Sequence, residues 1–476
     1  MTGPVFSSSS PRTLRSPRLV FFPGAPWAWA VAAAVAAWSA PLRAQDTLRP
    51  PVEQGVRVGI TYTPGLRPGL LVLGGPRRDL LDSVRAIVRR DLDDSDRFEM
   101  ITLPGSDSLM VAVGAGMGAP AAGTKSGSFV NYALYQALGA DYTVDVVDRP
   151  DSGIAVMVYD VKGGGVRKAI PVPVTDLKSP DFRFDVHRAS DEVVRAAAGT
   201  PGIAATRILF ENNRRVYRVD ADGADAVAIT QPGGGTMSPT WAPDGRRMVY
   251  SEQAGPIRRL VVVDVASGQR DVVGPTTTGV NFAPAFSPDG RTLAFSRSDE
   301  DGTHIYAYNL ADHCCLQRLT AGRFSDNLSP TFSPDGRRIA FVSTRAGAPQ
   351  IYAMSADGTE QELFAPFDYG VTGSSYAPEW SPDGLHLAFH RDVAGTYQIF
   401  VMDVASRSVR QLTSAGRNED PTWAPDGRHL AFVSSRTGTR QIWVMDMDTG
   451  RVRQLTRLDG ARLPSWSPRV SDTNHH

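Results

Sequence analysis

Ser329-Pro330-Thr331-Phe332-Ser333-Pro334-Asp335-Gly336 is one of six near-copies of a single phrase in the second half of this 476-residue chain. Each copy places an aromatic residue two positions ahead of the second Pro. The other copies begin at Ser238, Ala283, Ala377, Asp420 and Leu463, and the last one stops before its Asp-Gly. The Asp of the turn recurs every 43 to 48 residues. This period is typical of one four-stranded propeller blade.

Each repeat unit predicts four short strands. The aromatic segment before the turn is the first, and runs such as Arg338–Ser343, Gln350–Met354 and Arg410–Thr413 predict the other three. In the turn between the first two strands, Pro presets φ and Gly accepts φ > 0 where strand pairing resumes. The Trp or Phe of the phrase is expected to wedge between neighbouring blades.

The two ends of the repeat region complement each other. Residues 208–230 match strands two to four of a unit that lacks its first strand, and Leu463–Trp466 matches a first strand without the rest. Pairing the two would close the ring and remove two open sheet edges. Five whole units and this composite therefore predict an all-β six-bladed β-propeller over residues 203–470.

An α/β amino-terminal domain is predicted over residues 56–200. Its expected elements are a strand at Val56–Tyr62, a helix whose apolar residues run from Leu80 to Leu92, a hairpin of Tyr142–Val147 and Ile154–Asp160, and a helix at Phe184–Ala198. The stretch Pro104–Ser128 is rich in Gly, Ala and Ser and is expected to be flexible.

The first 44 residues have the pattern of a signal peptide. Arg12, Arg15 and Arg18 precede an apolar run at Trp27–Ser39, and cleavage is expected after Ala44. The run is shorter than the ~20 residues that span a bilayer. We therefore expect export to the periplasm without direct membrane insertion after cleavage; retention of the segment as an anchor is the alternative. Residues 45–55 are expected to form a flexible mature amino terminus, and residues 471–476 a tail.

Charge and cysteine content narrow the classes of partner. The 50 basic and 50 acidic residues balance, and arginines are scattered through the repeats, so no nucleic-acid partner is predicted.

The only cysteines are Cys314 and Cys315. In an exported protein they could form a vicinal disulfide, or they could remain two thiols without a role.

No sequence motif for catalysis is present. The chain has no Gly-x-Ser-x-Gly elbow, Walker loop, His-Glu-x-x-His or dinucleotide fingerprint. His386 and His390 share one face of a strand, but a pair without a third ligand is interpreted as core or surface decoration. We therefore predict that the chain is not an enzyme and needs no cofactor or metal.

Recognition surfaces remain as the candidate site. The loops that join strand four of one unit to strand one of the next should surround the mouth of the propeller channel. They mix Gly, Asn, Asp, Thr and aromatic residues, a composition suited to a protein or a polar ligand. Asn281, Asn327, Ser375 and Glu419 lie in or beside these loops.

The repeat phrase, the split blade, the export signal and the α/β domain together resemble the TolB family, the periplasmic propeller proteins of the Tol–Pal system. The resemblance includes Arg90–Leu92, Ala137–Tyr142, His187–Val193 and the terminal Leu463–Pro468. It implies a non-enzymatic adaptor that supports outer-membrane integrity and constriction during cell division.

The resemblance also implies two partners. TolB-like proteins bind the peptidoglycan-associated lipoprotein Pal at the channel mouth, and TolA through the mature amino-terminal segment. The residues expected at the mouth are Asn281, Ala283, Asn327, Ser329, Ser375, Glu419 and Asp420. Those expected in the segment are Val56, Arg57, Val58 and Ile60. The alternative hypothesis is an exported propeller that binds a carbohydrate or peptide, or assists a separate hydrolase.

Overall fold

The computed structural model describes residues 67–75, 78–102, 130–149, 153–173, 176–179, 181–322, 325–367 and 373–469. All of these belong to one compact unit, Gln54–His476. The expected signal peptide, the segment with Val56, Arg57, Val58 and Ile60, the stretch Pro104–Ser128 and the tail lie outside the described residues. Within the described part, no helix is both long and apolar enough to cross a membrane.

The amino-terminal domain is a five-stranded mixed sheet with helices. Its strands, in the order β2-β1-β3-β4-β5, are β2 (Glu99–Ile101), β1 (Gly69–Val72), β3 (Tyr142–Arg149), β4 (Gly153–Asp160) and β5 (Gly165–Pro171). Its described helices are α1 (Asp79–Asp94), α3 (Tyr132–Ala137) and α4 (Phe182–Ala198). The expected hairpin is confirmed as β3 and β4, and the two expected helices as α1 and α4. The parallel pairing of β1 with β2 and β3, and strand β5, were not predicted.

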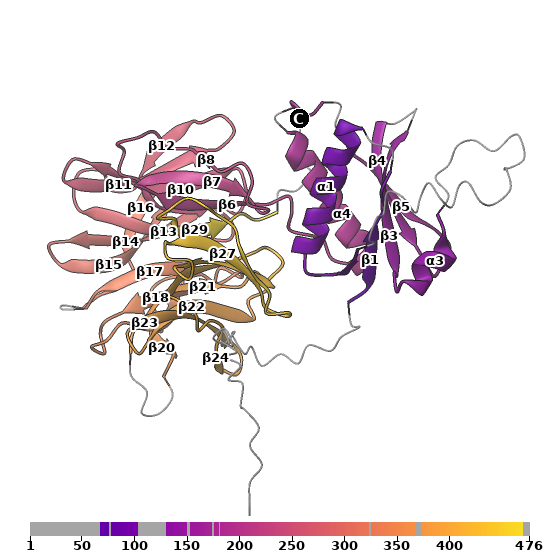
Figure 1. Ribbon diagram of the computed structural model, residues 1–476. Coiled ribbons are helices and arrows are strands. Elements are labelled where there is room, and N and C mark those ends of the chain that lie inside the picture. The colour runs from indigo at the N-terminus through magenta and orange to yellow at the C-terminus, as the bar shows by residue number, and fades with distance from the viewer. Residues whose placement is uncertain are drawn as a thin grey trace, which may run out of the picture. The chain divides into compact units, whose positions relative to one another are not determined.

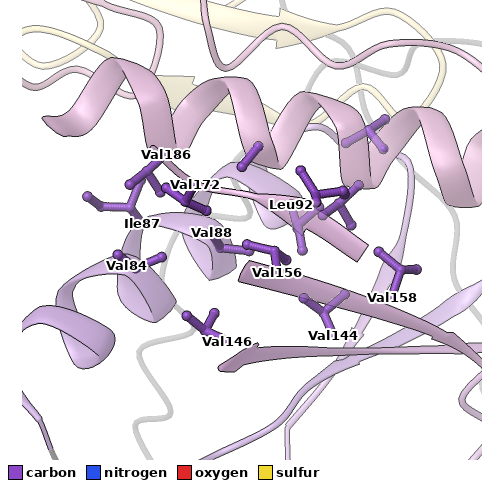
Figure 2. Packing of buried hydrophobic residues seen from close by; sticks show 14 of the residues in the cluster. Val84, Ile87, Val88, Leu92, Val144, Val146, Val156, Val158, Val172 and Val186 are labelled. Carbon is purple, nitrogen blue, oxygen red and sulfur yellow. The ribbon is translucent and has the colours of Figure 1, made fainter. Parts of the chain in front are cut away.

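One apolar core holds this domain together. Helices α1 and α4 pack against each other and against β3, β4 and β5 (Figure 1). Figure 2 shows their valine, isoleucine and leucine side chains meeting those of the sheet. Val84, Val88 and Leu92 recur on one face of α1 at helical spacing and are fully buried. Gly199 ends α4 in the left-handed conformation, with φ 81°.

The second half of the chain is a β-propeller. Four repeat units form separate four-stranded sheets, whose strands are β29 (Arg462–Trp466), β6 (Arg207–Asn212), β7 (Arg215–Asp220) and β8 (Val227–Ala228); β17 (Asn327–Phe332), β18 (Arg338–Ser343), β19 (Gln350–Ser355) and β20 (Glu362–Ala365); β21 (Ser375–Trp380), β22 (His386–Val393), β23 (Thr396–Asp403) and β24 (Val409–Gln411); and β25 (Asn418–Trp423), β26 (His429–Ser434), β27 (Gln441–Asp446) and β28 (Val452–Gln454).

The other two units share one eight-stranded sheet. Its strands are β9 (Met237–Trp241), β10 (Arg247–Ala254), β11 (Ile257–Asp264), β12 (Arg270–Val273), β13 (Val280–Phe286), β14 (Thr292–Asp299), β15 (Gly302–Asn309) and β16 (Cys314–Arg318). A single parallel pair, Arg258 with Val280, joins β11 to β13. The prediction of six separate blades is therefore correct for four units only, because this one pair merges the remaining two into one sheet.

The predicted closure of the ring is confirmed. Strand β29, from the end of the chain, pairs antiparallel with β6, and Trp466 lies opposite Ile208. The backbone N–H of Ser467 donates to the carbonyl oxygen of Arg207 at 2.8 Å. The first and last segments of the repeat region thus form one sheet with no free edge between them.

The turn and the aromatic wedge behave as their residue types predict. Asp289 accepts hydrogen bonds from the hydroxyl of Ser287 and the backbone N–H of Arg291, and Gly290 has φ 68°. Trp380 of β21 packs on Phe364 of the preceding sheet, with ring centroids 5.4 Å apart. The wedge residues therefore join neighbouring sheets.

The structure pairs the two cysteines. Cys314 and Cys315, at the start of β16, form a vicinal disulfide. Of the two states that the sequence left open, the oxidised one is therefore present.

Candidate functional site

The first strand of each unit, which lies innermost in its blade, has a β-bulge near its start. The residue before the first Pro of the phrase has a φ between 46° and 51° in all six copies: Ser238, Ala283, Ser329, Ala377, Asp420 and Leu463. The pairing with the second strand shifts register at each of these positions. Because Pro has no N–H for the ladder, a bulge forms at this point.

These bulged strands surround a cavity of about 400 Å³. Residues from all six copies of the phrase line it, among them Trp241, Phe286, Phe332, Trp380, Trp423 and Trp466. Within the described residues, Glu379 and Asp420 are the titratable side chains of the lining. The channel thus combines aromatic and proline walls with two carboxyl groups.

The two carboxyl groups have unusual pKa values. Burial raises the pKa of Glu379 to about 7, although its carboxylate accepts hydrogen bonds from the Trp423 backbone N–H at 3.1 Å and the Thr422 hydroxyl at 2.8 Å. Burial and the nearby charge of Glu419 raise the pKa of Asp420 to about 7. Both carboxyl groups therefore change protonation state near neutral pH rather than near pH 4.

Three of the expected mouth residues line the channel: Ala283, Ser329 and Asp420. At Ser329 and Asp420 the bulge turns the backbone N–H out of its own strand ladder. The N–H of Ser329 donates to the Ser296 hydroxyl at 2.9 Å, and that of Asp420 to Nδ1 of His390 at 3.1 Å. Side chains on the second strand of the preceding unit, β14 for Ser329 and β22 for Asp420, thus satisfy the freed donors.

Three other expected residues, Asn281, Asn327 and Ser375, are fully buried. The Asn281 amide donates to the carbonyl oxygens of Arg258 at 2.8 Å and Pro275 at 3.0 Å. Their side chains therefore organise the mouth loops from beneath and expose no surface.

Glu419 is the half-buried acidic residue of the mouth. Its carboxylate accepts from Arg417 at 2.8 Å, and Arg440 lies 3.4 Å away. Burial acts to raise the pKa of Glu419, but these two arginines outweigh it and hold the pKa below its usual value. Glu419 is therefore a charged carboxylate whose negative charge is already balanced by Arg417 and Arg440.

Asn418 was missed by sequence reasoning. It stands two positions before the bulge residue, as Asn281, Asn327 and Ser375 do in their copies, and is equally buried. Aligning the six copies on the bulge would have found it. The common position indicates a shared loop-supporting role.

The histidine pair interpreted as decoration does not form a site. His390 is buried between the rings of Tyr376 and Tyr397, and burial lowers its pKa to about 4. Among the described residues, two other groups place three possible metal ligands together: Asp91, His187 and Asp222, and Asp96, His429 and Asp446. However, Arg90 and Arg183 already pair with Asp222, and Arg428 pairs with Asp446. These guanidinium groups compensate the carboxylates without an ion.

A family model described as the TolB beta propeller domain matches residues 195–366 and 369–473, which is more than half of the chain. The chain belongs to this family. A relative named Tol-Pal system protein TolB from Anaeromyxobacter dehalogenans is 31% identical over 242 residues, covering 49% of this chain and 52% of the relative. One of the same name from Alcanivorax borkumensis is 28% identical over 234 residues, covering 46% and 49%. The chain thus spans about half the length of these curated relatives.

The fold is also that of a solved TolB. The crystal structure of TolB from Acinetobacter baumannii matches with a TM-score of 0.68 at 22% identity, covering 86% of this chain and 99% of the other. Because the match covers 86% of this chain, the likeness extends beyond the propeller into the α/β domain of this chain, and it concerns the fold.

Proposed function

We propose that the protein is a non-enzymatic periplasmic adaptor of the Tol–Pal system that supports outer-membrane integrity and constriction during cell division. In this proposal, Pal docks at the mouth of the channel, and TolA binds the amino-terminal segment that contains Val56, Arg57, Val58 and Ile60. Membership of the TolB propeller family supports the role.

The mouth formed by six copies of one phrase is the observation that carries the proposal. We infer that the eight-stranded sheet acts as two blades, so that six blades surround one channel. Ala283, Ser329 and Asp420 face this channel, whereas Asn281, Asn327 and Ser375 hold the loops around it. Glu419 adds a charge beside the opening. A protein partner would rest on this rim.

Calorimetric titration of the mature chain, from Gln45 onward, with the soluble domain of Pal from the same organism tests the proposal. We expect a one-to-one complex that Ser329→Trp abolishes, because the indole would obstruct the mouth. Ser267→Trp, in an exposed turn between outer strands β11 and β12, is the matched control and should bind normally. Absence of binding by the unaltered chain would refute Pal docking.

The TolA part of the proposal has its own test. A chain that lacks residues 45–62 should lose TolA and still bind Pal. Unchanged binding of both partners would show that the segment is not the TolA site.

A second candidate function is supported by the channel lining. Aromatic residues and the carboxyl groups of Glu379 and Asp420 converge there, as a carbohydrate- or peptide-binding propeller requires. If Pal fails to bind and a small glycan or peptide protects the tryptophans from fluorescence quenching, this function replaces the adaptor.

A further inference from the structure

Four arginines stack on aromatic rings at the end of the blades where the innermost strands begin. They are Arg297, Arg345, Arg391 and Arg436, with guanidinium carbons 3.8 to 5.7 Å from the ring centroids. Each lies near the end of the second strand of its unit, and this strand runs antiparallel to the first. The arginines are therefore next to the channel mouth.

Arg345 is held in place by its own unit. Its Nε donates to the Ser343 hydroxyl at 2.9 Å, and its Nη2 donates to the amide oxygen of Asn327 at 3.1 Å. The guanidinium lies over the rings of Phe341 and Tyr352, 5.5 and 4.7 Å from their centroids. Asn327 is thus a fixed support for an exposed arginine.

Arg436, two units further along the ring, repeats this arrangement. Its Nε donates to the Ser434 hydroxyl at 2.9 Å, and its Nη2 to the amide oxygen of Asn418 at 3.2 Å. Its guanidinium lies over Phe432 and Trp443, at 5.4 and 4.7 Å. A serine, an asparagine and a phenylalanine therefore hold the guanidinium in the same way in both units, and the second ring is Tyr352 in one and Trp443 in the other.

Neither guanidinium has a carboxylate partner among the residues that the structure describes. By contrast, Asp299 lies 3.3 Å from Arg297, and Glu419 lies 2.8 Å from Arg417. Burial lowers the pKa of Arg345, opposed by the Tyr352 phenol and by no carboxylate, and burial likewise lowers the pKa of Arg436. The described hydrogen bonds of each guanidinium use Nε and Nη2 and leave the Nη1 donors available.

We propose that Arg345 and Arg436 form a two-point anion site that binds carboxylate side chains of the protein partner at the channel mouth. This inference rests on the proposed function and specifies the chemistry of the docking surface. A guanidinium matches the two oxygens of a carboxylate. Because stacking and hydrogen bonds already order both side chains, little conformational entropy is lost on binding. Pal should therefore present acidic residues to these two blades.

Titration of the mature chain with the soluble domain of Pal tests this proposal with R345Q, R436Q and the double variant. A lost charge-assisted pair corresponds to roughly a tenfold weaker Kd for each substitution. R345K and R436K keep the charge without the planar fork, so they should restore only part of the affinity. Raising NaCl from about 0.05 M to about 0.5 M should weaken the binding of Pal to the unaltered chain more than its binding to the double variant.

R291Q and R337Q are matched controls. Both residues are exposed arginines in the Pro-Asp-Gly turns, at the opposite end of the innermost strands. These controls should bind Pal normally, and thermal unfolding should show that every variant is folded. If the double variant binds as tightly as the controls, the anion site is refuted and the adaptor function stands. If the unaltered chain does not bind Pal, both proposals fall.

Discussion

At the residue scale, burial changes the pKa of the Glu379 carboxyl group in the channel. Four of the six copies have Thr or Ser at this position, one has Ala, and only this copy has an acid. Its oxygen accepts from the Thr422 hydroxyl and the Trp423 backbone N–H, a role that a neutral acceptor can also fill. Burial nevertheless leaves this acid with a pKa of about 7.

We predict that Glu379→Gln stabilises the protein increasingly as pH rises. The folded-state pKa of about 7 exceeds the unfolded value of about 4.3. The unaltered protein therefore loses stability as pH rises from about 4 through about 7, because ionisation is easier in the unfolded chain. The variant lacks this loss and retains an amide oxygen as acceptor. Urea unfolding of both proteins at pH 5 and pH 8 measures the difference, and an equal difference at the two pH values would contradict the prediction.

At the element scale, strand β29 closes the propeller through a few specific contacts. The indole N–H of Trp466 donates to the Thr206 hydroxyl at 2.8 Å, and its backbone N–H donates to the Thr422 hydroxyl at 3.2 Å. Trp466 is 5% exposed and packs on residues of its own sheet and of the neighbouring sheet β25–β28. One residue thus joins the end of the chain to two neighbours.

Trp466→Ala should therefore lower the free energy of unfolding by about 3 to 5 kcal/mol, the range for deleting a buried large aromatic side chain. Trp466→Phe keeps most of the packing and loses the indole hydrogen bond, so its cost should be smaller. Urea denaturation followed by circular dichroism gives both values. A loss below about 1 kcal/mol for the alanine variant would mean that the closure strand contributes little to stability.

At the scale of the whole molecule, ion pairs connect the α/β domain to the propeller. Arg451 binds Asp93, in the last turn of α1, at 2.7 Å and Asp96, just beyond that helix, at 3.2 Å. His429 of β26 lies between Asp426, at 2.8 Å, and Asp96, at 3.5 Å. The apolar clusters of the two domains are separate. The contact between the two domains should consequently weaken when one of these charged groups loses its charge.

We predict that His429 stabilises the protein below neutral pH. Burial alone would lower its pKa, but Asp426 and Asp96 outweigh burial and raise it to about 9. A histidine with a raised folded-state pKa stabilises fully below its unfolded pKa of about 6.5, and this contribution is lost as pH rises through about 9. His429→Gln should therefore lower Tm more at pH 6 than at pH 9.5.

The exposed His313 provides the control for this prediction. His313→Gln should leave Tm nearly unchanged at both pH values. If His429→Gln lowered Tm equally at pH 6 and pH 9.5, the charged histidine would not be the cause.

Much of the propeller follows from the sequence alone, because its signals act between neighbouring residues. Pro, Asp and Gly set the backbone of each turn, as at Ser287–Gly290, whatever the rest of the chain does. Repetition of the phrase places the strands, and its truncated last copy predicts the pairing of β29 with β6. The helical spacing of Val84, Val88 and Leu92 predicts α1 in the same local way.

The tertiary structure alone decided which polar side chains of the mouth loops are exposed and which are buried. Asn281 and Asn327 belong to polar loops, but residues distant in sequence bury them and turn them into loop supports. Asp96 and His429 are more than 330 positions apart, so no local pattern could pair them. Burial and charge depend on every group that folding brings near a side chain, and the strand pattern contains no information on these groups. The sequence therefore determined the repeating scaffold, whereas three-dimensional packing decided the charges and surfaces of the candidate site.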